Sequence, residues 1–281
     1  PSNTALCVGP AIDYVVVKTY NPYTASPVTA VMAKSRLNAY LKAEGAELAL
    51  ADYKAGDKVI PYEIIAELKG ADLVGMHYKQ LMPWVKPLEK MGHLAADFVN
   101  EYAQAHPEKV FAVGADQFVE LSELAFRVIA GDYVTTDDGT GIVHIAPTFG
   151  ADDAKVARLA GVPGLQVVDR NGDAQAQVDL RGRFFCIEDL DPEYAAANMS
   201  PEYAEWAGRY VKNAYDASLG EDAPTLDVDI CVMLKQQNKA FRIEKHTHNY
   251  PHCWRTDKPV LYYPLNSWFI KTTAVRERMM E

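Results

Sequence analysis

The chain has 281 residues, of which 49% are hydrophobic and 23% charged, and its formal net charge at pH 7 is −10. This length and apolar content suffice for one sizeable core with a smaller appended unit. No run approaches the roughly 18 apolar residues that a membrane-spanning helix needs, so we expect no membrane partner. The acidic balance argues against a protein that wraps nucleic acid by itself, because phosphate neutralisation requires clustered lysine and arginine.

In the N-terminal half, short strand-like runs alternate with turns and one helical pattern. The strands are predicted at residues 5–20, 28–33, 47–51, 111–113 and 118–119. A helix is predicted at residues 35–44, where Gly45 ends it, and a further ordered segment at 59–68 ends at the Gly70 turn. Residues 87–105 carry little strand signal and are predicted as helix or loop.

In the C-terminal half, Asn171 and Gly172 stand between two β-rich runs, at residues 165–168 and 174–178. Asn-Gly between such flanks is the strongest short-range hairpin signal, so we predict a hairpin there. Residues 192–211 have a helical pattern rich in alanine and aromatic side chains. Three further elements are predicted: a basic helix-like stretch after Pro224, an aromatic strand at 260–263 and a final helix from Thr272.

These elements together predict an α+β fold, with a mixed, partly barrel-like β-sheet core and surrounding helices. A composition shift near residues 220–224 places a domain boundary between residues 1–220 and a C-terminal segment, residues 221–281. That segment is locally basic in an acidic chain, and exposed lysine and arginine are either a solvated face or a binding patch. The side chains concerned are Lys235, Lys239, Arg242, Lys245, Arg255, Lys258, His246, His248 and His252.

The four cysteines stand far apart in the sequence and lack the paired spacing of a zinc site. They are Cys7, Cys186, Cys231 and Cys253. Scattered cysteines in a chain of this length are typical of reduced, buried thiols, so we expect a cytoplasmic protein without disulfides.

A zinc hypothesis nevertheless attaches to His246, His248, His252 and Cys253. Structural zinc prefers four convergent ligands, usually including a closely spaced pair such as Cys-x₂₋₄-Cys. Thr256 stands where a second cysteine would complete such a pair, and on that ligand count we expect no zinc.

The most informative stretch runs from Gly139 to Asp153. It begins with a tight turn, in which Gly139 and Gly141 permit backbone conformations that a Cβ would forbid. An apolar run at residues 142–146 then predicts a short buried strand, which Pro147 stops.

His144 lies within that strand, and Asp152 and Asp153 begin an amphipathic helix beyond it. Because strand side chains alternate, His144 faces opposite to Val143 and Ile145. The imidazole of His144 and the two carboxylates are thus expected at the same rim of a pocket, as in many small-molecule sites. The alternative is structural, since acids at a helix start cap free N–H groups and favour the positive dipole end. The residues by themselves leave both interpretations open.

Residues 139–153 closely resemble the editing-site motif of the isoleucyl-tRNA synthetases, whose editing domain is inserted in a class I catalytic domain. Three more stretches resemble that family: residues 1–8, residues 68–75 with Tyr78 and Pro83, and residues 250–255 with 267–269. The resemblance therefore spans nearly the whole chain, and it implies the same partly barrel-like α+β fold. Valyl and leucyl relatives usually follow the Gly-Thr-Gly turn with other residues, so the run at 143–147 favours the isoleucyl branch.

The resemblance implies a proofreading aminoacyl-ester hydrolase. A hydrophobic pocket separates isoleucine from valine by only about 1–3 kcal/mol, for which this synthetase is itself the established example, and a second site hydrolyses whatever is small enough to enter. The implied substrate is valine esterified to the acceptor end of tRNA(Ile), with valyl-adenylate as a further candidate. The implied partners are that tRNA and the remainder of the parent synthetase, and the basic C-terminal patch would meet one of them.

Three residues are expected to touch the substrate. Asp153 aligns with the family residue that holds the α-ammonium group, a task suited to a charge-assisted hydrogen bond. His144 aligns with the family's size-reading histidine, whose ring admits valine and collides with isoleucine, while a general base is the alternative role. Asn3 aligns with a polar residue near the ester and ribose, where its amide would orient water or substrate, and turn chemistry is its alternative.

The other positions expected to bind substrate are Thr140, Gly141, Ile142, Asp152 and Phe149. Thr140 and nearby backbone N–H groups would line the adenosine end, whereas Asp152 is also a plausible helix cap. The sequence contains no recognisable pair of a nucleophile and a general base, so we expect direct attack by a positioned water on the activated ester. A metal-dependent hydrolase using His144 with the two aspartates is a weaker alternative.

One departure from the family concerns its threonine-rich peptide, which would lie immediately before Pro1. Its hydroxyls contribute to the pocket wall, so we expect weak or no hydrolysis by the chain as given. The alternative function is then a non-catalytic module that binds an amino acid or the tRNA 3′ end. We expect no cofactor for editing, because ATP and Mg²⁺ belong to the catalytic domain. The His-Ile-Gly-His and Lys-Met-Ser-Lys-Ser motifs of that domain do not occur in the sequence, so aminoacylation is not expected.

Overall fold

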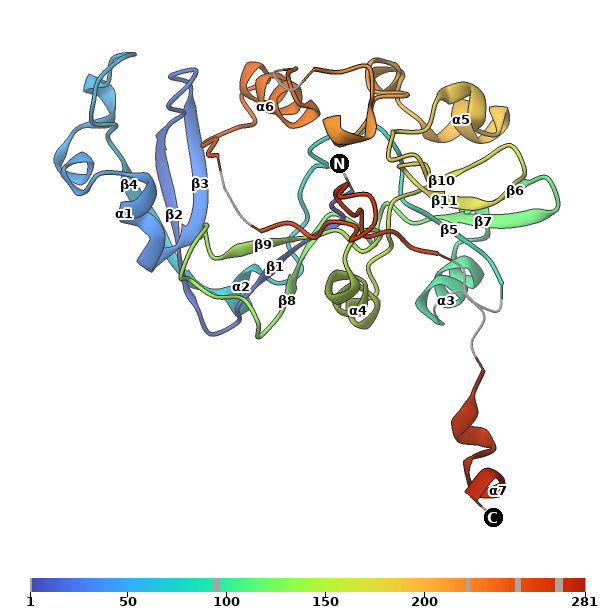
Figure 1. Cartoon of the computed structure of the whole chain (residues 1–281). Coiled ribbons are helices and arrows are strands. Elements are labelled where there is room, and N and C mark those ends of the chain that lie inside the picture. Colours follow the sequence, from blue (N-terminus) through green and yellow to red (C-terminus); the bar gives the residue numbers. More distant parts are fainter. Residues whose placement is uncertain (1, 93–96, 221–222, 246–248, 266–269, 281) are drawn as a thin grey trace.

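The computed structural model describes residues 2–92, 97–220, 223–245, 249–265 and 270–280. Within this part, short strands form four small sheets with helices between and around them (Figure 1). The predicted α+β class is confirmed. The described sheets do not form a closed barrel, because none has more than three strands and closure requires a longer staggered sheet.

The central sheet carries the motif strand and has the order β8-β1-β9. Its strands are β1 (Ala5–Val8), β8 (Arg127–Ala130) and β9 (Ile142–Ile145). β1 pairs parallel with β8 and antiparallel with β9, where Ala5 lies opposite Ile145. The predicted strand at 142–146 is confirmed. The continuous strand predicted at 5–20 is wrong, because a turn closed by the Ile12 N–H and the Gly9 carbonyl separates β1 from the next strand.

One face of the central sheet is covered by α4 (Ala151–Ala160). Alternate side chains of β1 and β9, including Ala5, Cys7 and Ile145, form a buried cluster with Ala157 of this helix. The helix ends at Gly161, whose φ of 65° provides the left-handed C-cap that glycine favours. This packing fixes which side chains of β9 face the helix and which face away.

A second sheet of order β3-β2-β4 forms an arm at one side of the molecule (Figure 1). Its elements are β2 (Asp13–Tyr20), β3 (Pro27–Ala33), α1 (Leu37–Tyr40), β4 (Glu63–Lys69) and α2 (Gly70–Leu73). The helix predicted at 35–44 is therefore only one turn long. The strand predicted at 47–51 is wrong, since 3-10 turns occupy Ala43–Glu47 and Leu50–Asp52. Gly45 packs so closely on the Ile60 carbonyl that the chain curls there instead of extending.

The body on the other side contains the two remaining sheets and the largest buried cluster, which includes Trp84, Phe118, Tyr203 and Trp206. Its elements are β5 (Leu88–Lys90), α3 (Asp97–Ala105), β6 (Val110–Val113), β7 (Asp116–Glu120), β10 (Gln166–Val168), β11 (Ala174–Ala176) and α5 (Pro192–Asn198). The Asn-Gly hairpin is confirmed as β10–β11. The helical pattern at 192–211 is confirmed only in part, because α5 is followed by a 3-10 turn at Pro201–Glu205.

The C-terminal segment contains α6 (Leu226–Gln236) and α7 (Arg276–Met280). After α6 the chain packs on the arm, where the Asn21 amide donates to the Ala240 carbonyl at 2.8 Å. No strand forms at the predicted 260–263. The Val260 N–H donates to the Pro251 carbonyl at 2.9 Å, and the Tyr263 hydroxyl donates to the Val178 carbonyl. The boundary at residue 220 stays a prediction. None of the described helices has the length and apolar character needed to cross a membrane.

Candidate functional site

Asp153 lies in the first turn of α4 and bonds back to the end of β9. Its Oδ2 accepts a hydrogen bond of 2.8 Å from the backbone N–H of Ala146, the residue after the strand. The N-cap of α4 is Gly150, which has no side chain to cap the helix, so carboxylates here also face the positive helix end. Asp152 is exposed and, within the described residues, makes no hydrogen bond or ion pair. One oxygen of Asp153 is therefore anchored while the other stays available to a ligand.

Tyr133 stands beside this acidic pair on the α4 side of the sheet. Its hydroxyl donates to the sulfur of Cys7, and burial, with the negative charges of Asp153 and Asp152, raises the pKa of Tyr133. The phenol thus remains a neutral donor at physiological pH. No motif in the sequence singled out this tyrosine, because its partner Cys7 lies on β1, more than 120 residues earlier in the chain.

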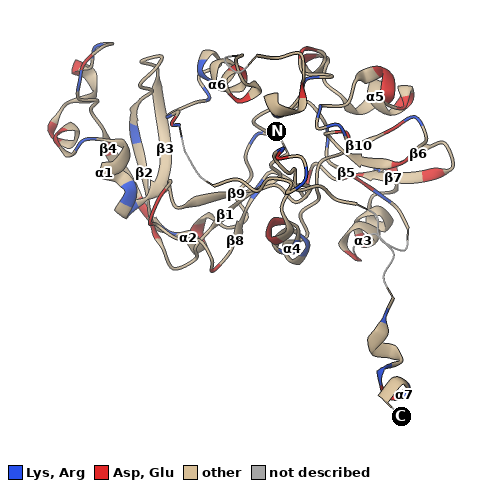
Figure 2. Cartoon of the chain, viewed as in Figure 1, with Lys and Arg blue, Asp and Glu red and all other residues tan. Residues whose placement is uncertain are grey.

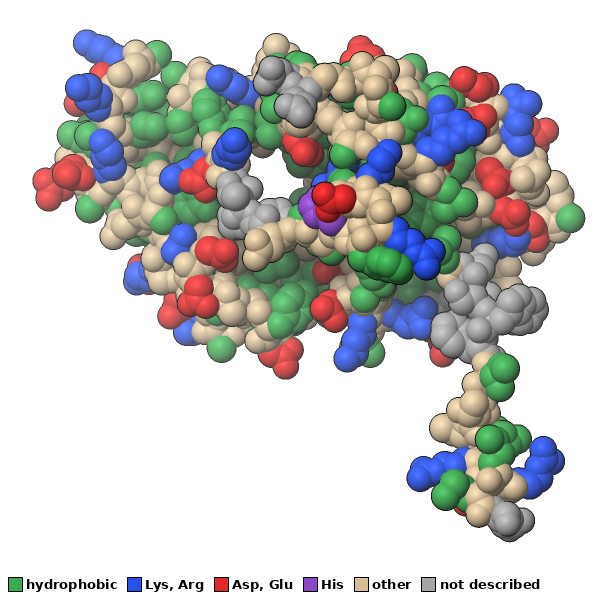
Figure 3. Space-filling view, in the orientation of Figure 1, with side chains coloured by type: hydrophobic (Ala, Val, Ile, Leu, Met, Phe, Trp, Pro, Cys, Tyr) green, Lys and Arg blue, Asp and Glu red, His purple; other side chains and the backbone are tan. Residues whose placement is uncertain are grey.

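His144 lies on the opposite face of the sheet from α4. It is exposed and lies opposite Leu6 of β1, and it makes no hydrogen bond or ion pair within the described part of the chain. The space-filling view shows an opening beside the segment that follows α6 (Figure 3). The expectation that the imidazole and the carboxylate face one rim is corrected, because His144 and α4 lie on opposite faces of the sheet. A ligand can meet both His144 and Asp153 only around the end of β9.

Asn3 precedes β1 and lies close to that same end of β9. The backbone N–H of Thr4 donates to the Ile145 carbonyl at 2.9 Å, and Asn3 itself accepts a bond of 3.0 Å from the hydroxyl of Tyr78. The structure thus brings Asn3, the strand end and Asp153 into one neighbourhood. The Tyr78 contact had no signal in the sequence, because it joins residues from distant parts of the chain.

The glycine turn lies at the other end of β9, where its backbone is bonded to the rest of the fold. The Thr140 carbonyl accepts from the Ala33 N–H at 2.8 Å, the Gly139 carbonyl from Arg36 at 2.9 Å and the Gly141 carbonyl from the Tyr14 hydroxyl at 2.6 Å. β9 is about 10 Å long at roughly 3.3 Å per residue. Residues 139–141 therefore cannot touch the same part of a ligand as Asp153.

Two predicted substrate-binding side chains make packing contacts. Ile142 is partly buried against a cluster that includes Val8 and Tyr14. Phe149 packs on the main core and meets Tyr263 edge to face, with ring centroids 6.3 Å apart. Their roles in substrate binding stay predictions.

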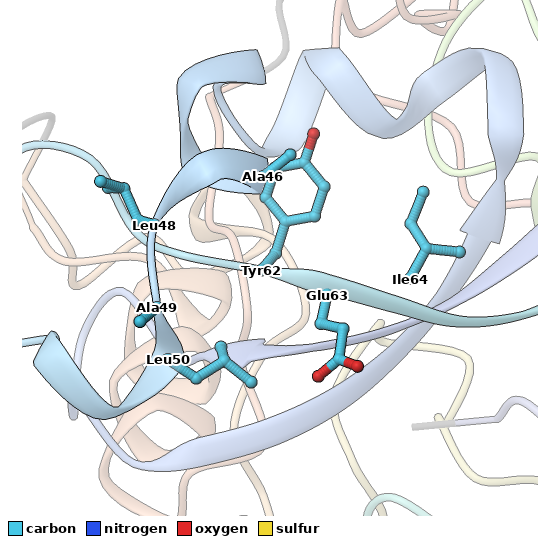
Figure 4. A pocket seen from close by; sticks show the side chains of 7 residues that line it. All are labelled: Ala46, Leu48, Ala49, Leu50, Tyr62, Glu63 and Ile64. Atoms are coloured by element: carbon cyan, nitrogen blue, oxygen red, sulfur yellow. The ribbon is translucent and has the colours of Figure 1, made fainter.

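Three hollows lined by described residues show where this chain is open, and neither His144 nor Asp153 lines any of these three. One of about 400 Å³ lies against β4, with Leu48, Leu50, Tyr62, Glu63 and Ile64 in its wall (Figure 4). A smaller hollow of about 220 Å³ shares Leu50 with it. The third, of about 480 Å³, has Thr140 in its wall together with residues of α6 and the segment after it.

Three basic side chains in α6 and the segment after it are engaged within the chain. Lys235 lies over the ring of Tyr23, Lys239 donates to the Leu81 carbonyl at 3.1 Å and Arg242 bonds the Ala39 carbonyl. Acidic and basic positions are interspersed around α6 (Figure 2). Contacts within the chain are therefore sufficient to hold these three side chains where they lie.

The proposed zinc ligands are only partly within the described residues, since His246 and His248 lie outside them. His252 bonds the Tyr250 carbonyl at 2.9 Å. Hydrogen bonds from Thr256 and the Arg255 N–H lower the pKa of Cys253. The residues that the structure describes contain no group of three or more histidine, cysteine or acidic side chains placed to hold a metal.

The chain is similar to isoleucine–tRNA ligases over its entire length, although no protein-family model matches it. It is 55% identical over 282 residues to the isoleucine–tRNA ligase of Bacteroides fragilis. It is 52% identical over 282 residues to that of Porphyromonas gingivalis and 31% identical over 281 residues to that of Clostridium tetani.

All of the chain is aligned in each case, but it spans only 22%, 22% and 18% of the length of these three relatives. The resemblance inferred from residues 139–153 and three other stretches is thereby confirmed. Over its whole length, the chain corresponds to one segment of the isoleucine–tRNA ligases.

Proposed function

We propose that this segment is the proofreading site of an isoleucine–tRNA ligase, and that it hydrolyses valine from mischarged tRNA(Ile). The observation that carries the proposal is the anchored carboxylate of Asp153 at the end of the strand that bears His144. In a chain that matches isoleucine–tRNA ligases throughout, this end of β9 supports the editing-site interpretation of the motif. Valyl-adenylate is a second substrate of the same site in this proposal.

The free oxygen of Asp153 receives the α-ammonium group of the aminoacyl ester. Such a charge-assisted bond holds any amino acid without reading its side chain. Selection then falls to His144, whose exposed ring meets the aliphatic side chain and leaves room for valine but not for the extra methylene of isoleucine. A water attacks the ester carbonyl directly, aided by positioning and by donors that stabilise the developing negative charge.

The proposal is tested by Asp153→Asn in a full-length isoleucine–tRNA ligase that carries this segment. Asparagine keeps an acceptor for the Ala146 N–H but loses the charge, so we expect deacylation of valyl-tRNA(Ile) to fall about 100-fold. Isoleucine aminoacylation should stay unchanged. The matched control is Asp227→Asn, which removes an exposed acid from the first turn of α6 and should leave deacylation intact.

Unchanged deacylation in Asp153→Asn would overturn the proposed role of this carboxylate. Asp152→Asn ranks the two acids, and a larger loss there would reassign the ammonium contact to Asp152. Binding of a non-hydrolysable valyl-adenosine mimic, without any hydrolysis of valyl-tRNA(Ile) by the unsubstituted ligase, would favour a binding module instead.

A further inference from the structure

Tyr78 and Asn3 form a hydrogen-bonded pair across the chain that leads into β8. The Tyr78 hydroxyl lies 3.0 Å from Asn3 Oδ1. Between them, the Phe126 carbonyl accepts from the Tyr78 N–H at 2.8 Å, and the Phe126 N–H donates to the Thr4 carbonyl. The two backbones are therefore fixed on either side of the bend at Phe126, which sets the separation of their side chains.

The ring of Tyr78 is held independently of its hydroxyl. It meets Phe126 edge to face with centroids 6.0 Å apart and packs on the buried cluster that contains Ala125 and Leu165. Burial also raises the pKa of Tyr78, so the hydroxyl keeps its proton at physiological pH. Tyr78 is thus a rigid donor aimed at Asn3.

This donor decides which way the Asn3 amide points. Within the described residues the Tyr78 hydroxyl has no acceptor other than Asn3 Oδ1, and the amide nitrogen of Asn3 has no acceptor at all. A flipped amide would donate to the hydroxyl and leave the buried hydroxyl proton unpaired, which is unfavourable. The oxygen of Asn3 therefore faces Tyr78, and its two N–H donors remain free beside the end of β9.

We propose that Tyr78 is a positioning residue that makes Asn3 a donor to the ester carbonyl oxygen of the substrate. This inference rests on the proposed function. When water attacks the carbonyl carbon, a carbon–oxygen bond forms and the carbonyl electron pair moves onto oxygen. The Asn3 N–H group stabilises that oxyanion. The electron pair then returns, and the ribose oxygen leaves with a proton from the attacking water. Asn3 does not serve as the base for that proton, because a carboxamide is far too weakly basic to hold it.

The test is a double-mutant cycle on deacylation by the full-length ligase. Tyr78→Phe keeps the ring and its packing, and it should lower kcat about tenfold with KM unchanged, the size expected for one lost hydrogen bond. Asn3→Ala should lower kcat at least as far. In the Asn3→Ala background, adding Tyr78→Phe should have no further effect, because the amide that it orients is gone.

Two further variants separate orientation from general stability. Asn3→Asp retains an acceptor for Tyr78 but replaces the N–H donors by an oxygen, so its kcat should fall as far as that of Asn3→Ala. Tyr203→Phe removes another buried hydroxyl, which donates to the Phe185 carbonyl at 2.8 Å, and it should leave kcat unchanged.

Three results would each overturn the positioning role while leaving the proposed function intact. The first is a wild-type kcat in Tyr78→Phe, and the second is an active Asn3→Asp variant. The third is that Tyr78→Phe lowers kcat in the Asn3→Ala background as much as it does in the wild type. A full-length ligase without deacylation would overturn both. The pair itself has a readout independent of activity. The side-chain amide NMR signals that Asn3→Ala deletes should shift in Tyr78→Phe and not in Tyr203→Phe.

Discussion

The two ends of β9 differ in how their polar groups are used. At the glycine-turn end, three successive carbonyls accept hydrogen bonds from Arg36, Ala33 and Tyr14. At the other end, His144 is exposed without a hydrogen bond in the described residues, and Asp153 bonds one backbone N–H. Polar groups already paired within the fold contribute stability, whereas unpaired ones beside an opening remain free for a ligand. About ten ångströms of strand thus separate an end whose polar groups are paired within the fold from the end that we propose binds the substrate.

The motif at residues 139–153 includes residues at both ends of β9, so its residues need not share one role. Gly139, Gly141 and the two aspartates occur within fifteen residues, and their spacing by itself favours one common role. The contacts separate them: variants at the turn should change stability without changing selectivity, and variants at the far end should do the reverse. The predictions below test that division.

The largest effect is expected for Gly141→Ala at the turn. Gly141 has a φ of 74°, and a Cβ there would lie 2.6 Å from the Cβ of Ala33. Backbone strain and overlap together should lower the free energy of unfolding by about 3 kcal/mol, measured by urea denaturation of the chain.

Gly139→Ala is the matched control for that substitution. Its φ of 57° is also positive, but nothing lies within 4 Å of a Cβ built there. It should lose only about 1 kcal/mol through strain. Equal losses in the two variants would show that the turn is not packed against the arm as described.

At the binding end, His144→Ala should change selectivity. Removing the ring admits one more methylene, so deacylation of isoleucyl-tRNA(Ile) should rise about 10- to 100-fold, measured in the full-length ligase. The free energy of unfolding should stay within about 0.5 kcal/mol, because the side chain is exposed. If His144 were instead a general base, deacylation of valyl-tRNA(Ile) would fall in this variant and that of isoleucyl-tRNA(Ile) would not rise.

Glu89 of β5 makes the stability of the chain depend on pH. Burial raises the pKa of Glu89 to about 7 from an ordinary value of 4.5, against the Gly164 N–H and Arg158, which lower it. Gly164 in turn packs on Thr148, between β9 and α4. Between pH 4.5 and about 7, the Glu89 carboxyl therefore keeps its proton in the folded state but has lost it in the unfolded state. The free energy of unfolding falls as pH rises through this window.

Glu89→Gln should abolish this fall and make the chain more stable than wild type above pH 7, by about 1–2 kcal/mol in urea denaturation. Glu120 of β7 provides an opposite control. Although burial opposes it, hydrogen bonds from Ser122 and the charge of Lys109 lower the pKa of Glu120. Glu120→Gln should therefore destabilise the chain at neutral pH. A parallel pH profile for wild type and Glu89→Gln would contradict the assignment.

Local signals predicted the parts of the fold that local contacts determine. β9, α4 with its Gly161 end and the hairpin across residues 171–172 follow from periodicity and turn residues within about fifteen positions. The strand predicted at 47–51 failed because Gly45 packs on Ile60, a contact with a later part of the chain. For the site, the motif predicted Asp153 and His144, and their roles stay predictions. The Asn3–Tyr78 pair spans 75 residues and depends on the bend at Phe126 that lies between them. No pattern of spacing encodes such a pair.

The smallest effect is expected at Arg36, which closes the outer side of the turn. Its Nε donates to the Gly139 carbonyl at 2.9 Å and its Nη1 to the Asp137 carbonyl at 3.1 Å. The side chain is only partly buried, so water replaces much of what is lost, and Arg36→Met should cost only about 0.5–1 kcal/mol in urea denaturation. Arg36→Lys should restore less than half of the free energy of unfolding that Arg36→Met loses. One ammonium group cannot reproduce the planar guanidinium that donates to both carbonyls. Deacylation and its selectivity should be unchanged in both variants. Altered selectivity would mean that the turn communicates with the far end of β9, and the division between a structural end and a binding end would fail.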